Sequence, residues 1–270
     1  IIMRKQKMSI IIKRALTIII FNLIVFAQDI DWINKTITVD GGAYGKNKLM
    51  AKRGAETDAR RNLIEALKEI RVDSRTTMRD MEVEEDIVVT EASGFIRQAW
   101  IDDSSIKYER EDEKWMCSIS MTMPLLGEYS QVLSQATSKR PSEAKTPVYK
   151  PAATPPPPKE PYTGLIVDLR GNRVVPSMIP KIVTEEGAVV YGMSIVSRQY
   201  ATNMGVVGYI KKIDNPISMT RVGENPLVVK AKGTTGATPS DALVSSKDAD
   251  LISSLETNLL KECKVAFLID

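Results

Sequence analysis

The chain has 270 residues, 43% of them hydrophobic and 26% charged, which is enough apolar material for two folded domains of ordinary size. It contains no histidine and only two cysteines, so Ser-His-Asp and Cys-His catalytic arrangements and the usual zinc sites are excluded. The formal net charge is +3, but five basic residues and no acidic residue precede residue 28, which leaves the rest of the chain at −2. No basic stripe with interleaved aromatic residues remains there, so we expect no nucleic-acid partner.

The first 27 residues have the pattern of a secretory signal peptide. A basic segment precedes an apolar run at residues 15–26, and small residues occupy the positions that signal peptidase requires before the end of Ala27. The alternative is an uncleaved membrane anchor, but Lys13 and Arg14 interrupt the apolar stretch, which falls short of the roughly 20 residues that cross a bilayer. We therefore predict cleavage after Ala27 and a location in the periplasm or in association with the outer membrane. Membrane contact is then peripheral, or made through an uncleaved signal.

Residues 28–125 are predicted to form an α+β domain that begins with a strand and two helices. Apolar and polar residues alternate at 32–39 and are followed by Gly41-Gly42, which predicts a first strand and its turn. Apolar residues then recur at spacings of three and four, which predicts helices at 50–70 and 79–98. The buried face of the first helix is assigned to Ala55, Ala59, Leu63, Ala66, Leu67 and Ile70.

Two strands are predicted to close this domain as an antiparallel hairpin. They span residues 100–109 and 114–123 and are joined by a polar turn. In the second strand, Cys117, Ile119 and Met121 alternate with Ser118 and Ser120, so one face of that strand is expected to be buried. The element order of the domain is therefore β-α-α-β-β.

The helix "AKRGAETDARRNLIEAL" and the hairpin "GFIRQAWIDDSSIKYEREDEKWMCSISMTMPL" resemble the lipoprotein-20 family, over residues 30–125. That family includes the flagellar assembly proteins T and P of bacterial envelopes, whose members build rings or disks around the flagellar basal body. The resemblance implies a non-enzymatic role in assembly. No lipobox cysteine follows the signal, so the chain departs from the lipid-anchored members.

Residues 126–161 are predicted to form a proline-rich linker. Eight of the fourteen prolines lie between Pro141 and Pro161, and such a composition favours a semi-extended polyproline II spacer. The alternative is a ligand for aromatic-lined grooves. The linker divides the chain into two small domains.

Residues 162–270 are predicted to form a C-terminal domain of mixed α/β sheet character. Strands are expected at 165–169, 205–213 and 227–231, with a hairpin across Glu185-Glu186-Gly187. A helix at 247–260, capped by Ser245 or Ser246, is expected to precede a buried last strand at 264–269. The stretches "YTGLIVDLRG", "NPLVVKA" and "CKVAFLID" resemble C-terminal regions that accompany the N-terminal domain in some exported family members.

The two cysteines allow a disulfide, because the predicted compartment is oxidising. Cys117 and Cys263 are both expected in strands, and the alternative is a pair of buried free thiols in separate domains. Trp100 and Trp115 are the candidates for partner contact, since aromatic residues are enriched where proteins meet other proteins.

A carboxylate pair is the one catalytic device that this composition permits, because glycosidases need only two acidic residues. The candidates lie at turns or on solvent-facing positions of predicted strands, where charged residues are most often solvated. They are Asp102, Asp103, Glu109, Glu111, Glu185 and Glu186.

The sequence thus predicts an exported, non-enzymatic structural or assembly protein of the bacterial cell envelope, without cofactor or metal. Its expected partners are further copies of itself or other envelope proteins, and a flagellar accessory ring or basal disk is the specific version. The alternative is a periplasmic protein that binds carbohydrate or peptidoglycan, or a carboxylate-based hydrolase.

Overall fold

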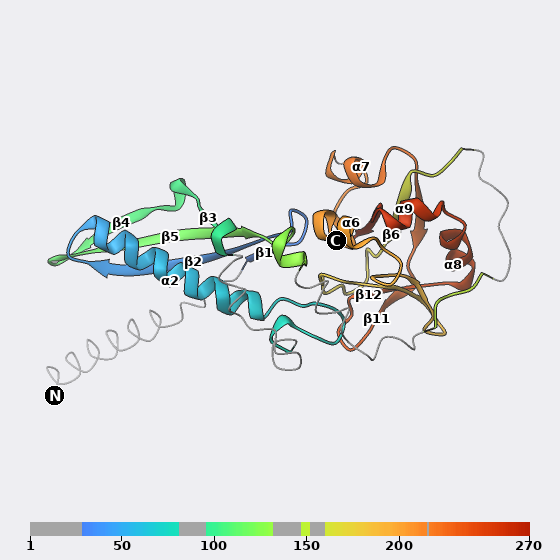
Figure 1. Cartoon of the computed structure of the whole chain (residues 1–270), viewed down its shortest axis with the longest axis horizontal. Helices are drawn as coiled ribbons and strands as arrows, with labels where there is room; N and C mark the ends of the chain where they lie inside the picture. The colour runs from blue at the N-terminus through green and yellow to red at the C-terminus, as the bar shows by residue number, and fades with distance from the viewer. Residues whose placement is uncertain (1–28, 81–95, 132–146, 152–159, 215) are drawn as a thin grey trace, which may run out of the picture.

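The computed structural model describes residues 29–80, 96–131, 147–151, 160–214 and 216–270 (Figure 1). The predicted signal peptide, the middle of the second predicted helix and most of the proline-rich segment lie outside these residues. The described part confirms the α+β class, with one sheet in an N-terminal unit and two sheets in a C-terminal unit.

The N-terminal unit is built on an antiparallel sheet whose two long strands pair along their whole length. These are β2 (Thr36–Gly45) and β5 (Lys114–Pro124), which pair from Thr36 opposite Pro124 to Gly45 opposite Trp115. The predicted turn at Gly41-Gly42 is wrong, because β2 continues through both glycines. The shorter strands are β1 (Asp29–Asp31), β3 (Trp100–Ile101) and β4 (Lys107–Glu111).

The glycines of β2 lie where helix α2 (Lys48–Lys68) packs closely on the sheet. A Cβ on Gly41 would lie 2.5 Å from the Ala55 carbonyl oxygen, and one on Gly45 would lie 2.3 Å from the Ala51 nitrogen. The alanines of the helix are buried against this strand, as their spacing predicts. Small residues on both elements therefore let the two backbones approach one another.

The predicted strand at 100–109 is interrupted. Asp102 caps a short 3-10 helix, Asp103–Ser105, by accepting a hydrogen bond from the Ser104 N–H, and this helix separates β3 from β4. A second 3-10 helix, Ile96–Gln98, precedes β3. The strand β5 agrees with its prediction, with Cys117, Ile119 and Met121 all buried.

The C-terminal unit contains a parallel sheet of order β10-β6-β13-β9. The two strands that come first in the chain, β6 and β9, alternate in this order with the two later ones, β10 and β13. Neither half of the unit therefore forms the sheet by itself. One face packs into the main core, and the other is covered by helix α7, beside which Ile166, Ile210, Val222, Ala266 and Leu268 form a small cluster. The strands are β6 (Gly164–Asp168), β9 (Gly208–Ile210), β10 (Pro226–Lys230) and β13 (Val265–Leu268), and α7 spans Pro216–Val222.

A second, mixed sheet of order β11-β12-β7-β8 completes this unit. The predicted hairpin across Glu185-Glu186-Gly187 is confirmed, whereas the predicted helix 247–260 is two helices separated near Ser254. Within the proline-rich stretch, Tyr149 donates its N–H to the Val189 carbonyl, so this part of it packs onto β8. The elements are β7 (Ile182–Thr184), β8 (Val189–Tyr191), α6 (Arg198–Met204), β11 (Gly233–Thr235), β12 (Asp241–Val244), α8 (Ser246–Ser253) and α9 (Thr257–Lys261).

Arg221 of α7 joins the two halves of the parallel sheet. Its guanidinium donates to the carbonyls of Met204 and Gly205, where α6 leads into β9, and to those of Cys263 and Val265, where α9 leads into β13. Gly205 and Cys263 both have a positive φ. One side chain thereby holds two helix-to-strand turns.

Candidate functional site

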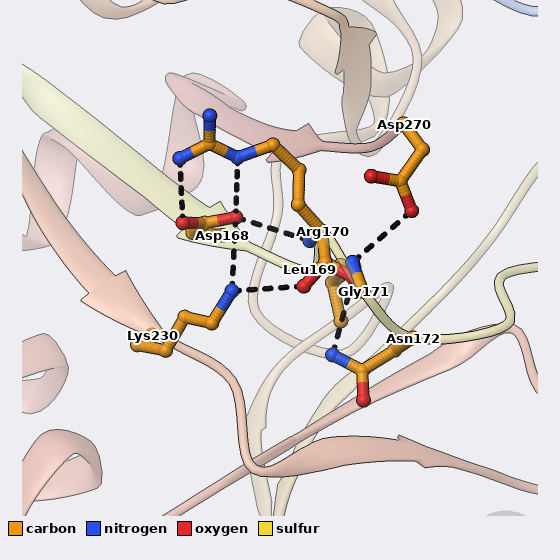
Figure 2. Close-up of polar contacts among 7 residues, drawn as sticks. All are labelled: Asp168, Leu169, Arg170, Gly171, Asn172, Lys230 and Asp270. Carbon is orange, nitrogen blue, oxygen red and sulfur yellow. Dashed lines mark hydrogen bonds and ion pairs between the residues drawn. The ribbon is translucent and has the colours of Figure 1, made fainter.

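The carboxyl ends of the parallel strands carry a cluster of charged residues (Figure 2). This edge is where open α/β sheets commonly bind ligands. Arg170 forms two hydrogen bonds to the Asp168 carboxylate, at 3.0 and 2.9 Å, and Lys230 lies 3.5 Å from the same group. Lys230 also donates to the Arg170 carbonyl at 2.8 Å, and the Asp270 carboxylate accepts from the Gly171 N–H at 3.0 Å.

The charges of this cluster are satisfied within the cluster itself. The hydrogen bonds from the Arg170 side chain hold the pKa of Asp168 well below its ordinary value, against partial desolvation, and the Arg170 N–H and Lys230 lower it further. Asp168 is therefore a firmly ionised carboxylate, which is unsuited to donate a proton. Its geometry ties the loop after β6 to the end of β10.

The six candidate carboxylates do not converge on one site. Asp102 caps the short helix Asp103–Ser105, and Glu111 accepts a hydrogen bond of 2.8 Å from the Tyr44 hydroxyl in the N-terminal unit. Glu185 pairs with Lys232 at 2.8 Å in the C-terminal unit. Asp102, Glu111 and Glu185 thus have separate local partners.

Cys117 and Cys263 are free and buried in different units. Burial raises the pKa of the Cys263 thiol to about 11, although the nearby Arg221 charge opposes this shift. Burial also raises the pKa of Cys117. The structure therefore shows two separate thiols and not the disulfide.

The two candidate tryptophans have different surroundings. Trp100 is 49% exposed on β3, where it lies opposite Thr122 of β5. Trp115 is half-buried beneath α2, with the Lys48 ammonium 4.6 Å and the Arg110 guanidinium 5.8 Å from its ring. Trp100 keeps an accessible ring, whereas much of the Trp115 ring is used within the chain.

The junction between the two units contains a buried lysine. Lys35, in the turn between β1 and β2, places its ammonium 4.4 Å from the Tyr209 ring and 5.1 Å from the Trp32 ring. Trp32 in turn packs edge-to-face on Tyr209, with ring centroids 5.8 Å apart. Burial lowers the pKa of Lys35 well below its usual value, and the positive charge of Arg221 contributes to the shift.

Residues that follow β5 extend this first contact. The Gly127 N–H donates to the Thr202 carbonyl at 2.9 Å, and the Ser130 hydroxyl donates to the Ala201 carbonyl at 3.2 Å. Tyr129 is buried beside them, and its hydroxyl donates to the Leu67 carbonyl of α2. The segment after β5 therefore lies between the two units.

A second contact forms just after the C-terminal end of α2. The backbone N–H groups of Met178 and Ile179 donate to the carbonyls of Arg71 and Val72, at 3.0 and 2.8 Å. The Thr238 N–H donates to the Ser74 carbonyl at 2.8 Å. Because the N-terminal unit is attached at both the sheet and the helix, rotation about either contact is opposed by the other.

Sequence reasoning missed this junction. Lys35 lies in a turn between a short strand and a long one, and Arg71 and Ser74 follow a helix, so each pattern by itself indicates a solvated loop. The only local signal is the aromatic Trp32 within that turn.

Three or more acidic or cysteine side chains do not gather into a metal-binding group anywhere in the described ranges. Among the helices of those ranges, none has the length and apolar character needed to span a bilayer.

The C-terminal part of the chain matches a protein-family model. Residues 164–270 match the family model for the second domain of Tp0624 from Treponema pallidum, and this range coincides with the C-terminal unit from β6 onward. No curated protein sequence matches the chain. The C-terminal unit of this chain is thus similar to the second domain of a Treponema protein.

Proposed function

We propose that the protein is an exported, non-enzymatic assembly component of the bacterial cell envelope that acts through protein contacts. The observation that carries this proposal is the two-point junction, which holds the N-terminal unit as a projecting arm on the C-terminal unit (Figure 1). A fixed arm presents its far end at a set distance and direction. That property serves a component that joins other subunits.

The flagellar version of the proposal rests on the resemblance of residues 30–125 to the lipoprotein-20 family. In that version the protein is part of an accessory ring or basal disk, and the C-terminal unit provides the body from which the arm projects. The periplasm or the outer membrane is the proposed location.

The experiment is crosslinking in intact cells, with a photoreactive residue at exposed Trp100 and, as a control, at exposed Lys247 of α8. We expect crosslinks from position 100 to envelope proteins or to a second copy of the chain. Purified protein that also elutes as an oligomer would support assembly. A monomer that forms no crosslink at either position and that cleaves or binds peptidoglycan would overturn the proposal in favour of the alternative.

A further inference from the structure

The end of the arm farthest from the C-terminal unit is where β2 leads into α2 and where β4 turns into β5 (Figure 1). We call this end the arm tip and define it as residues 44–53 and 109–114, the β2–α2 connection and the β4–β5 turn. The two segments are adjacent, because Gly45 pairs with Trp115 and the Tyr44 hydroxyl binds Glu111.

The helix side of the arm tip is basic. It carries Lys46, Lys48, Lys52 and Arg53 with no acidic residue in the first turn of α2, and the positive end of the helix dipole lies at the same place. Cations are usually disfavoured at a helix N-terminus, so the local structure does not explain this choice.

The turn side of the arm tip is acidic. Glu109, Glu111, Asp112 and Glu113 outnumber Arg110 and Lys114, and all six residues are exposed. Arg110 is also used within the chain, since its guanidinium lies over the Trp115 ring. The arm tip therefore has a positive side and a negative side.

Exposed apolar side chains also lie at the arm tip, Leu49 and Met50 in the first turn of α2 and Tyr44 on the face of β2 that points away from the helix. Tyr44, Leu49 and Met50 are 54%, 59% and 53% exposed, and they are three of the large apolar residues that the described structure leaves most open to solvent. Adjacent exposed apolar residues of this kind mark interaction surfaces more often than scattered ones do.

We propose that the arm tip binds the arm tip of a second copy of this chain, related by a two-fold axis. Such an axis places the basic side of each copy against the acidic side of the other. The proposal rests on the assembly function above and names its contact surface. An anionic membrane fits less well, because the acidic turn at the same end would be repelled by it.

The small size of the arm tip predicts a weak contact. A stable interface uses about 20–30 residues on each side, more than the arm tip provides. In an assembly with further contacts, a weak pairing gains strength from the high local concentration of neighbouring subunits.

The test is a charge-swap experiment on the purified protein, measured by sedimentation over a wide concentration series. One variant carries Lys46→Glu and Arg53→Glu, and the other carries Glu109→Lys and Glu113→Lys. These positions are exposed, and they avoid Lys48 and Glu111, which have partners within the chain. A control variant carries Lys247→Glu and Lys261→Glu on the C-terminal unit.

Each arm-tip variant alone is expected to weaken self-association about tenfold or more, because like charges then face each other across the axis. An equimolar mixture of the two variants restores pairing, since both contacts are again between opposite charges. The control variant pairs like the unmodified protein. Circular dichroism confirms that each variant is folded.

Failure of the mixture to restore pairing would overturn the inference. If the protein self-associates equally in all variants, the arm-tip pairing is wrong while the assembly function stands. Binding to anionic vesicles that is lost in K46E/R53E and gained in E109K/E113K would assign the arm tip to lipid and also overturn it. Crosslinks in cells without any self-association in solution would leave only the proposed function standing.

Discussion

The two units of the chain differ in the side chains that hold their elements together, small ones in the N-terminal unit and large ones in the C-terminal unit. In the N-terminal unit, helix α2 lies on a strand whose glycines allow its alanines to reach the backbone, and the close contact leaves no space for a further carbon atom. In the C-terminal unit, two sheets enclose larger side chains such as Tyr191, Tyr209 and Phe267, and the guanidinium of Arg221 closes the turns.

This difference explains why each unit is sensitive to a different kind of change. A close backbone contact is disrupted by added volume, whereas a side-chain clamp is disrupted by a lost hydrogen-bond donor. The junction then transmits the orientation of one unit to the other. The following five predictions test this comparison.

The largest effect is expected for Arg221→Met in the C-terminal unit. The change keeps the aliphatic volume but removes the donors to four carbonyls, and we expect a loss of about 2–4 kcal/mol in the free energy of unfolding. Urea unfolding measures it. Arg221→Lys should recover only part of the loss, because an ammonium lacks the planar fork of the guanidinium.

In the N-terminal unit, Gly41→Ala is expected to cost about 2–3 kcal/mol, because its Cβ would overlap the backbone of α2. Gly42→Ala is the matched control. The Cβ at position 42 meets the flexible end of Met116, so its cost should stay below about 1 kcal/mol. Equal losses for the two variants, measured by thermal unfolding, would contradict the close packing of helix on strand.

Asp58→Ala tests how the outer edge of β2 is protected. Asp58 accepts from the Gly42 N–H at 3.1 Å, and Asn62 donates to the Asp40 carbonyl at 2.8 Å, so side chains of α2 satisfy groups on this edge. We expect a loss of about 1–2 kcal/mol and faster aggregation, because a bare edge can pair with another strand. Light scattering during storage measures the second effect, and Arg60→Ala, exposed on the same helix, is the control.

The pH dependence of Asp58 has a definite sign. Partial burial raises its pKa, but the hydrogen bonds from Gly42 and Arg61 outweigh burial and hold the pKa below 3.8. The stabilisation is therefore present above pH 3.8 and is lost as the pH falls through the lower pKa of the folded state. The Asp58→Ala variant should show a smaller loss of stability on acidification than the unmodified protein.

The smallest effect is expected for Lys35→Met at the junction, and it has the opposite sign. Below the folded-state pKa of Lys35 both states are protonated and the folded state bears the full cost of burying the charge, which is relieved as pH rises toward 10.5. The methionine variant should gain about 1 kcal/mol at neutral pH and lose this rise of stability with pH. A neutral or unfavourable result in denaturant titrations at several pH values would show that the aromatic rings fully compensate the charge.

Local patterns predicted those elements whose neighbours in space follow from one face of one element. The alternation in β5 and the alanine spacing of α2 each indicate a buried face without reference to the rest of the chain. The Gly41-Gly42 turn was mispredicted, because a glycine pair indicates a turn locally and only the contact with α2 reveals that it belongs to a strand. The break between α8 and α9 was also missed, since the apolar periodicity continues across it while Leu255 is buried at the break.

The junction and the contacts of Arg221 join residues that lie far apart in the sequence. Lys35 meets Tyr209, and Arg221 meets Met204 and Val265, across distances in the chain that no local period records. The amino-acid sequence by itself determined the α+β class, the buried faces and the absence of histidine chemistry, because these follow from composition and short-range periodicity. Only the tertiary structure decided the strand order, the two-point junction and the position of the arm tip, because these arise where distant segments exclude water together.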